Sequence, residues 1–289
     1  MPVFVREKGA LRRPLFLCAG ALFRAVQTVA LLERLLTTNW AVRDWLQGPL
    51  SRPTEIFRQR NYPVKSKEVL AMKSGKTQTE LRGVLFDWDG TLLNSYAADS
   101  AAYLAMFRAL GVPWGLRDLE AHYSPNWYRV YRAARIPRTK WGAADRVWRE
   151  HYSRQTPKLL PGVRRVLTVL SRRHALGLVT SGDRDRVHRQ LRAFRLWDHF
   201  SARVCSGDTR LRKPHPAPLR LALRHMKMRA EETVYVGDSP EDLEMARNAG
   251  VRAAIAVLGP FPTEKRLRAA APDLLLESIE ELPSALLEF

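Results

Sequence analysis

Four short apolar runs in this chain of 289 residues each end abruptly in a polar turn. The runs are 84–86, 175–179, 233–236 and 253–258, and the turns after them begin at Asp87, Thr180, Gly237 and Gly259. Helical patterns at 162–173, 184–194, 216–226 and 240–249 lie between the runs. Apolar strands that alternate with helices indicate an α/β fold, in which helices cover both faces of a doubly wound parallel sheet. Ligands of such sheets bind beyond the carboxyl ends of the strands, where we expect the polar turns to lie.

Two segments depart from this alternation. Residues 94–158 contain helical patterns but no clear strand, which predicts an inserted helical cap domain between two parts of the core, 81–93 and 159–289. Residues 1–80 hold fourteen Lys or Arg against six Asp or Glu, and no recognisable motif, so they predict a basic N-terminal extension. Three interpretations of the extension are open: a membrane-surface or partner helix over 21–36, a disordered basic arm, or upstream translation before a natural start at Met72.

The positive net charge of the chain indicates that it attracts anions, but it does not indicate which anion the protein binds. The formal net charge is +19, and the surplus is spread along the chain. Nucleic acid, anionic lipid and phosphorylated metabolites all respond to such a field, and a compositional bias toward Arg explains it equally well. The 46% of hydrophobic residues is ample for a core and excludes a disordered chain.

Cysteine content and targeting signals favour a reducing compartment. Cys18 and Cys205 are the two cysteines, far apart, so we expect neither a disulfide framework nor a cysteine metal site. Arg12 and Arg13 precede the apolar run 14–23 as in a secretory signal, but Arg24 interrupts it and no clean cleavage site follows. The run is shorter than the about 20 residues of a transmembrane helix. We therefore predict a cytoplasmic protein with no transmembrane segment.

The turn after the first apolar run carries two carboxylates, Asp87 and Asp89, followed by Gly90. Like charges this close repel unless a cation or a shared proton offsets them. Strand alternation points both the same way, and Gly90 permits the tight turn and close backbone approach that a phosphate needs. Taken alone, the pattern also fits a simple turn or part of a calcium loop.

A second acidic turn, 237–242, follows the third run and contains Asp238, Glu241 and Asp242. Carboxylates from two strand ends suit Mg²⁺, which prefers oxygen ligands. Ser239, Glu241 and Asp242 are also well placed to cap the helix predicted at 240–249, and capping is compatible with catalysis.

Two weaker signals lie between these turns. Lys213, flanked by Pro214 on the way to a helix, is suited to offset phosphate and carboxylate charge, although a lone loop lysine is usually solvated. Thr180 and the turn Ser181-Gly182 offer a hydroxyl and backbone N–H groups to an anion ahead of the helix at 184–194.

In this order the four motifs resemble those of the haloacid dehalogenase superfamily, in its phosphoglycolate phosphatase and β-phosphoglucomutase-like branch. The resemblance runs from Leu81 to the C-terminus and is most specific over 86–92 and 237–250. It implies a Rossmann-like core, and it matches residues 94–158 with the helical cap that gates access to the site in this branch. Asn94-Ser95 stands where Asp-Ser is usual at the cap hinge.

The resemblance also implies roles for individual residues. Asp87 would be the nucleophile that forms an aspartyl-phosphate, and Asp89 would be the general acid and base. Thr180 and Lys213 would bind the transferring phosphoryl group, together with backbone groups at Ser181, Gly182 and Gly90. Asp87, Asp238 and the backbone carbonyl of Asp89 would hold Mg²⁺, and Asp242 would support Lys213 or the metal from behind.

The second carboxylate, Asp89, argues against a dehalogenase and for a phosphatase that acts on a small phosphorylated metabolite. A sugar phosphomutase is the alternative if the cap excludes water from the intermediate. Arg and Trp residues of the cap either bind an extra anionic or aromatic group of the substrate or form a small cap core with a solvated face.

A protein of a different class, one that binds nucleic acid or an anionic surface, would also explain the +19 charge, although we expect no specific nucleic-acid partner. The chain is expected to be a monomer or homodimer.

Overall fold

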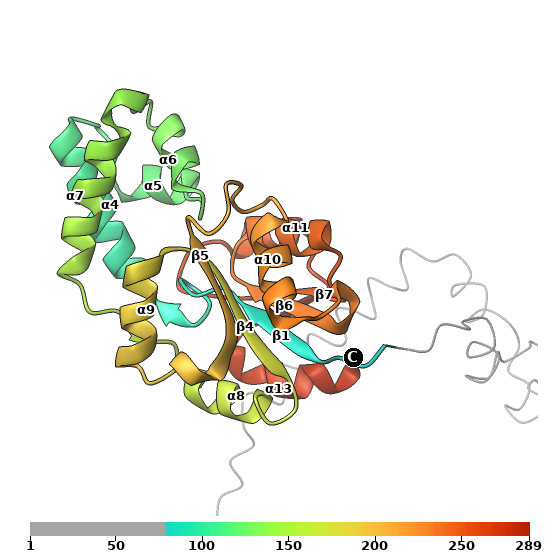
Figure 1. Cartoon of the computed structure of the whole chain (residues 1–289). Helices are drawn as coiled ribbons and strands as arrows, with labels where there is room; N and C mark the ends of the chain where they lie inside the picture. The colour runs from blue at the N-terminus through green and yellow to red at the C-terminus, as the bar shows by residue number, and fades with distance from the viewer. Residues whose placement is uncertain (1–78) are drawn as a thin grey trace, which may run out of the picture. The chain divides into compact units, whose positions relative to one another are not determined.

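The computed structural model describes residues 79–289, so the predictions for Cys18, Met72 and the helix at 21–36 lie outside the described residues. A parallel sheet of six strands forms its centre, in the order β5-β4-β1-β6-β7-β8 (Figure 1). The strands are β1 (Gly83–Phe86), β4 (Ala175–Asp183), β5 (Phe200–Ser206), β6 (Thr233–Gly237), β7 (Ala253–Val257) and β8 (Leu274–Leu276). Every neighbouring pair is parallel, which confirms the predicted fold class.

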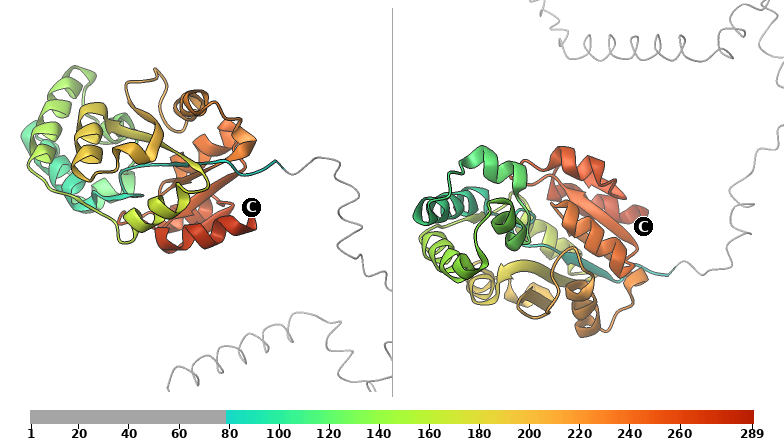
Figure 2. Two further views of the ribbon diagram at one scale, coloured as in Figure 1. Left: turned by 60° about the horizontal axis from the view of Figure 1, so that its bottom comes forward. Right: turned by 90° about the horizontal axis from the view of Figure 1, so that it is seen from above.

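Helices cover both faces of the sheet, as the views in Figure 2 show. Helices α8 (Val163–Leu170), α9 (Arg184–Ala193) and α13 (Leu282–Ala285) supply apolar side chains to one face, and α10 (Ala217–Met226), α11 (Pro240–Ala249) and α12 (Glu264–Ala269) to the other. The 3₁₀ turns are η2 (Arg138–Lys140), η3 (Trp197–His199), η4 (Ala230–Glu232), η5 (Ile279–Glu281) and η6 (Leu286–Glu288).

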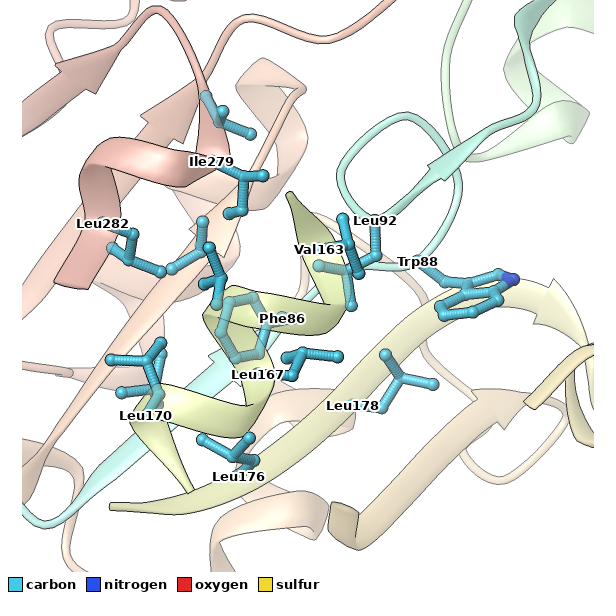
Figure 3. Packing of buried hydrophobic residues seen from close by; sticks show 14 of the residues in the cluster. Phe86, Trp88, Leu92, Val163, Leu167, Leu170, Leu176, Leu178, Ile279 and Leu282 are labelled. Atoms are coloured by element: carbon cyan, nitrogen blue, oxygen red, sulfur yellow. The ribbon is translucent and has the colours of Figure 1, made fainter. Parts of the chain in front are cut away.

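Strand alternation divides β1 between the two apolar clusters. Val84 and Phe86 pack with α8 and α13 on one face, where Figure 3 shows Phe86 among Leu167, Leu170 and Leu282. Leu85 packs on the opposite face with residues of α10 and α11. Because side chains of a strand point alternately to its two faces, a run of four buried residues is what a central, doubly covered strand requires.

Four helices follow the first strand and stand to one side of the sheet: α4 (Tyr96–Leu110), α5 (Leu116–His122), α6 (Trp127–Ala133) and α7 (Trp141–Ser153). Their aromatic and aliphatic side chains form a separate apolar cluster. The chain leaves and rejoins the core through a two-stranded antiparallel sheet, β2 (Leu93–Asn94) with β3 (Lys158–Leu159). We call the segment between these two strands the cap; the predicted domain limits at 94 and 158 fall on this pair and stay a prediction.

The strand predicted at 175–179 was too short. β4 continues through Thr180, Ser181 and Gly182 to Asp183, which pairs with Ser206 of β5 after a register irregularity. The predicted turn is therefore an irregular strand end. β5 and β8 have no counterpart among the four apolar runs.

No helix within residues 79–289 is both long and apolar enough to cross a membrane. Cys205 lies buried in β5, and burial raises the pKa of its thiol to about 11, which keeps it protonated at neutral pH.

Candidate active site

The carboxyl ends of the central strands bring the predicted site residues together. Asp87 follows β1, and its backbone N–H donates to the carbonyl of Val236 at 2.9 Å, which extends the β1–β6 ladder past the end of β1. Asp238 follows β6, and Thr180 lies near the end of β4. Parallel strands end at one edge of a sheet, so residues more than 140 positions apart in sequence meet here.

Lys213 stands at the centre of this edge and is only 2% exposed. Its ammonium group donates to Asp87 Oδ1 and Asp242 Oδ1, each at 2.7 Å, and to the hydroxyl of Tyr235 at 2.9 Å. These contacts use all three of its donors. Burial opposes the charge, but Asp242 and Asp87 outweigh it and hold the pKa of Lys213 above its ordinary value. The lysine is therefore a fixed positive charge rather than a solvated loop residue.

Asp242 is fully buried and acts as the anchor of Lys213. Its Oδ1 accepts from Lys213 and from Tyr235, while its Oδ2 accepts from the backbone N–H and hydroxyl of Ser239. The Ser239 hydroxyl also accepts from the Asp242 N–H, which completes a capping box at the start of α11. Capping and support of Lys213 thus occur in one side chain, as the sequence suggested.

Asp238 is held beside Asp87 by three neighbours. Its Oδ1 accepts from the Thr91 hydroxyl at 2.8 Å, and its backbone carbonyl accepts from Thr263 at 2.9 Å. Gly90 has a φ of +85°, and a Cβ there would lie 2.1 Å from Asp238 Oδ2, so no other residue fits without displacing the carboxylate. The N–H of Gly90 donates to Leu93, which leaves the predicted contact of Gly90 with phosphate untested.

The charges at this edge do not balance within the described residues. Carboxylate oxygens of Asp87, Asp238 and Asp242 lie within 4.8 Å of one another, and Lys213 is the only cation in contact with them in residues 79–289. Burial, only partly opposed by Lys213, raises the pKa of Asp87 to about 7. Burial and the charges of Asp87 and Asp242 raise the pKa of Asp238 well above its ordinary range.

An oxygen donor set with surplus negative charge fits a divalent cation. Because both oxygens of Asp242 already accept hydrogen bonds, Asp87 and Asp238 are the better ligands of the three. This is the pair that the sequence predicted, and the part of the Asp89 carbonyl in the ligand set stays a prediction.

Asp89 is bound by a residue that the sequence analysis missed. Arg186 of α9 donates to both of its carboxylate oxygens, at 2.9 and 2.5 Å. The same guanidinium lies 4.7 Å from the ring centroid of Tyr152 in the cap and donates to the Tyr152 hydroxyl at 3.1 Å. A Cβ at Gly182 would lie 2.4 Å from Arg186, so Gly182 makes room for this contact. Asp89 is thereby linked to the end of cap helix α7.

Thr180 is buried, and its hydroxyl oxygen accepts from the Gly182 N–H at 2.9 Å. That N–H is therefore already used by the protein. Asp183 caps α9 by accepting from the Arg186 N–H at 3.2 Å. Thr180, Ser181 and Gly182 remain at the surface of the cavity described next, and their contact with phosphate stays a prediction.

A cavity of about 320 Å³ lies between the sheet edge and the cap. Among the predicted site residues, those that line it are Asp87, Asp89, Thr180, Ser181 and Gly182. The other predicted site residues do not line it: Gly90, Lys213, Asp238 and Asp242. The cap supplies mostly aromatic walls, with Tyr103, Tyr123, Trp127, Tyr128, Tyr131 and Trp148.

Glu241 joins the cap to the core and was recognised in the sequence only as a capping candidate. It is 4% exposed, and its Oε1 accepts from Ser124 at 2.7 Å and from Arg129 at 3.3 Å, both in the cap. Arg266 of α12 lies 3.7 Å from Oε2 and donates to the carbonyl of Tyr123 at 2.9 Å. The acidic turn that positions Asp238 thus also holds the cap.

Comparisons with known proteins agree with this geometry. A family model described as haloacid dehalogenase-like hydrolase matches residues 84–256. The pyrophosphatase PpaX of Oceanobacillus iheyensis is 27% identical over 206 residues, which cover 70% of this chain and 95% of the relative. The phosphoglycolate phosphatase of Yersinia pseudotuberculosis is 29% identical over 217 residues, 71% of this chain and 93% of the relative. The crystal structure of CbbY from Rhodobacter sphaeroides in complex with phosphate is 25% identical, with a TM-score of 0.60 over 70% of this chain and 96% of that one.

Proposed function

The chain belongs to the haloacid dehalogenase-like hydrolases, and we propose that it is a Mg²⁺-dependent phosphatase that hydrolyses a small phosphate monoester through an aspartyl-phosphate on Asp87. One observation supports this most strongly: Lys213 holds Asp87 Oδ1 at 2.7 Å in a buried, acidic site that opens to the cavity. Relatives named phosphatases and pyrophosphatases support the class of reaction.

In the first half of the proposed reaction, an oxygen of Asp87 attacks phosphorus and the bond from phosphorus to the leaving oxygen breaks. Lys213 binds Asp87 through Oδ1, and no hydrogen bond from residues 79–289 reaches Oδ2, so we assign the attack to Oδ2. The fixed lysine orients the carboxylate before the substrate arrives, and such positioning is a large part of catalysis in phosphoryl transfer.

Asp89 is the proposed general acid and base. It gives a proton to the leaving oxygen, then takes one from the water that attacks the aspartyl-phosphate. Arg186 donates one hydrogen bond to each of its oxygens, which orients the carboxylate and leaves a second lone pair on each oxygen for a proton. Thr180, Ser181 and Gly182 are the proposed binding residues for the phosphoryl oxygens, and their position in the lining of the cavity supports this role.

Asp87, Asp238 and the backbone carbonyl of Asp89 are the proposed ligands of Mg²⁺. When bound, the ion neutralises charge on the phosphoryl oxygens. The surplus of buried carboxylates and the raised pKa values of Asp87 and Asp238 support a cation at this position.

Phosphate release from p-nitrophenyl phosphate, with Mg²⁺ or with a chelator, tests the reaction. Rapid quenching followed by borohydride reduction converts an aspartyl-phosphate to homoserine, which peptide mass spectrometry locates in the sequence. We expect Mg²⁺-dependent release and homoserine at position 87. Activity that survives chelation, or a label at another residue, would contradict the proposal. Transfer of the phosphoryl group to a sugar in preference to water would instead identify a phosphomutase.

A further inference from the structure

The cap half of the cavity is lined by a group of side chains that the proposed chemistry at Asp87 does not use. We call this group the ring subsite; it comprises Trp127, Tyr128, Tyr131, Asp145 and Trp148. A volume of about 320 Å³ for the whole cavity lies within the range of pockets that enclose drug-sized ligands, so a phosphoryl group with a two-carbon acid would leave the subsite unfilled.

The rings of the subsite are fixed in place but not fully covered. Tyr131 is 2% exposed and belongs to the cap core, whereas Trp127 and Tyr128 are half-buried. Tyr128 stacks on Trp141 with centroids 4.6 Å apart and planes at 14°, and Trp148 stacks on Tyr152 at 4.7 Å. Packing behind the rings therefore holds a rigid aromatic wall, which favours a planar ligand.

Two indole N–H groups of the ring subsite have no hydrogen-bond partner in the described part of the chain. They belong to Trp127 and Trp148, whose Nε1 atoms are buried. A buried donor without a partner costs free energy, and such groups in native proteins usually find one in a water, an ion or a ligand.

Asp145 adds an acceptor to the same wall. One of its oxygens accepts from the Tyr131 hydroxyl at 2.9 Å, and no hydrogen bond from the described part of the chain reaches the other. A half-buried carboxylate among aromatic rings suits ring N–H or amino groups, which donate hydrogen bonds, and it disfavours an anion.

Each arginine that lines the cavity contacts other side chains of the described residues. Arg212 lies over the rings of Trp127 and Tyr128, at 4.2 and 4.9 Å from their centroids, and donates to Ser206 at 2.9 Å. Arg186 binds Asp89, and Arg149 lies 4.0 Å from Asp183. Arg212 lines the same cavity as Asp87 and so adds its guanidinium to the aromatic wall.

We infer that the substrate is a phosphate monoester that bears a planar nitrogen heterocycle, of the size and polarity of a nucleoside 5′-monophosphate. The inference rests on the proposed function: the phosphate lies at Asp87, and the heterocycle lies against the wall that Arg212 forms with Trp127 and Tyr128, with its N–H groups toward Asp145.

Ribose 5-phosphate is the matched control substrate, because it has the same phosphate and nearly the same leaving oxygen as a nucleoside 5′-monophosphate but no base. We expect kcat/KM for the best of AMP, GMP, CMP and UMP to exceed that for ribose 5-phosphate by at least about tenfold, which lies in the lower part of the range for base stacking on aromatic side chains. Trp127→Leu should reduce this ratio to about threefold or less, whereas Trp127→Phe, which keeps a ring, should preserve most of it. Trp114→Phe, in the cap core away from the cavity, controls for repacking, and a thermal melt of each variant controls for folding.

Binding provides a measurement that does not depend on turnover. Titration of the Asp87→Asn variant with the same nucleotides should quench tryptophan fluorescence at concentrations at least about tenfold below those needed for ribose 5-phosphate. Equal kcat/KM and equal binding for nucleotides and ribose 5-phosphate would overturn the inference, and so would a preference for pyrophosphate or a sugar bisphosphate over every nucleotide. Loss of all hydrolysis, including that of p-nitrophenyl phosphate, would contradict the proposed function, whereas tight nucleotide binding would still support the ring subsite.

Discussion

The core and the cap differ in how far their buried polar groups are satisfied by hydrogen bonds. At the sheet edge, Lys213 uses all three donors and Asp242 both acceptors, so the groups around Asp87 are oriented before any ligand binds. In the cap, two indole N–H groups and one oxygen of Asp145 have no partner among residues 79–289. The difference is what the two proposals require: side chains at the sheet edge that are oriented before the reaction, and a cap wall that still has unused hydrogen-bonding groups.

The largest expected effect concerns the core alone. Asp87→Asn removes the proposed nucleophile and should lower kcat at least about 10³-fold, a typical loss for a nucleophile. The measurement is phosphate release from p-nitrophenyl phosphate with Mg²⁺. Asp185→Asn, a matched change at an exposed position of α9, should leave the rate as it is. A rate for Asp87→Asn within tenfold of the wild type would break the assignment of the reaction to the sheet edge.

The second prediction tests whether Lys213 and the carboxylates that it binds form one structural unit. Lys213→Met leaves Asp87 and Asp242 buried without their cation and should lower the free energy of unfolding by about 3–5 kcal/mol, as breaking a buried ion pair does. Urea denaturation measures it, with Lys265→Met, exposed on α12, as the control. Equal stability of the two variants would show that the network is not a structural unit.

A third prediction concerns the border between core and cap. Asp99 of α4 is buried, and burial together with the charge of Asp89 raises its pKa from 3.8 to about 7. The folded state therefore holds this proton more tightly than the unfolded chain does, so the free energy of unfolding should fall as pH rises from about 4 to about 7. The fall is at most about 4 kcal/mol for a shift of this size.

Asp99→Asn removes this titration and can still accept from the Tyr123 hydroxyl, which contacts Asp99 Oδ2 at 3.1 Å. Urea denaturation at pH 5 and pH 8 should show that the variant loses less stability than the wild type at the higher pH. Because Asp87 and Asp238 also have raised pKa values, the difference between the two proteins is the quantity to compare. An identical pH dependence would mean that Asp99 does not titrate in this range.

The smallest effect is expected at an exposed contact between cap and core. Arg129 pairs with Glu241 at 3.3 Å, but its side chain is 49% exposed. Exposed ion pairs contribute about 0–1 kcal/mol, so Arg129→Gln should change the free energy of unfolding by about 0.5 kcal/mol or less. A loss above about 2 kcal/mol would show that the buried hydrogen bond from Ser124 to Glu241 does not hold the cap by itself.

Local motifs pointed to Asp87, Thr180 and Asp238 because each lies at or near the end of one strand, and a parallel sheet assembles its strand ends whatever lies between them. Lys213 lies in the loop between β5 and α10, and only its charge marked it in the sequence. Arg186 could not be found from the sequence, because its partner Asp89 is 97 positions away and an arginine in a helix is usually exposed. The link from Ser124 to Glu241 spans 117 positions and leaves no local pattern.

The two strands that the sequence did not reveal are those at the sheet edges. β5 reads Phe-Ser-Ala-Arg-Val-Cys-Ser, with polar residues on one side, and β8 has only three residues. β5 therefore lacks the continuous apolar run that marked the central strands. β8 does have one, Leu274–Leu276, which is as long as the run 84–86 but is followed by no polar motif of the kind that drew attention to the others. In the cap, aromatic residues at helical spacing predicted a small core, but which ring faces stay open to the cavity depends on tertiary packing.

The short pairing of β2 with β3 has a consequence for replacement of the cap. Leu93 lies opposite Leu159 and Asn94 opposite Lys158, so the points where the chain leaves and rejoins the core are neighbours. A segment inserted between adjacent points adds little loop-closure entropy, and that cost grows only slowly with length. A cap of another length could therefore be joined at this pair of strands at little entropic cost, provided that it kept partners for Arg186 and Glu241.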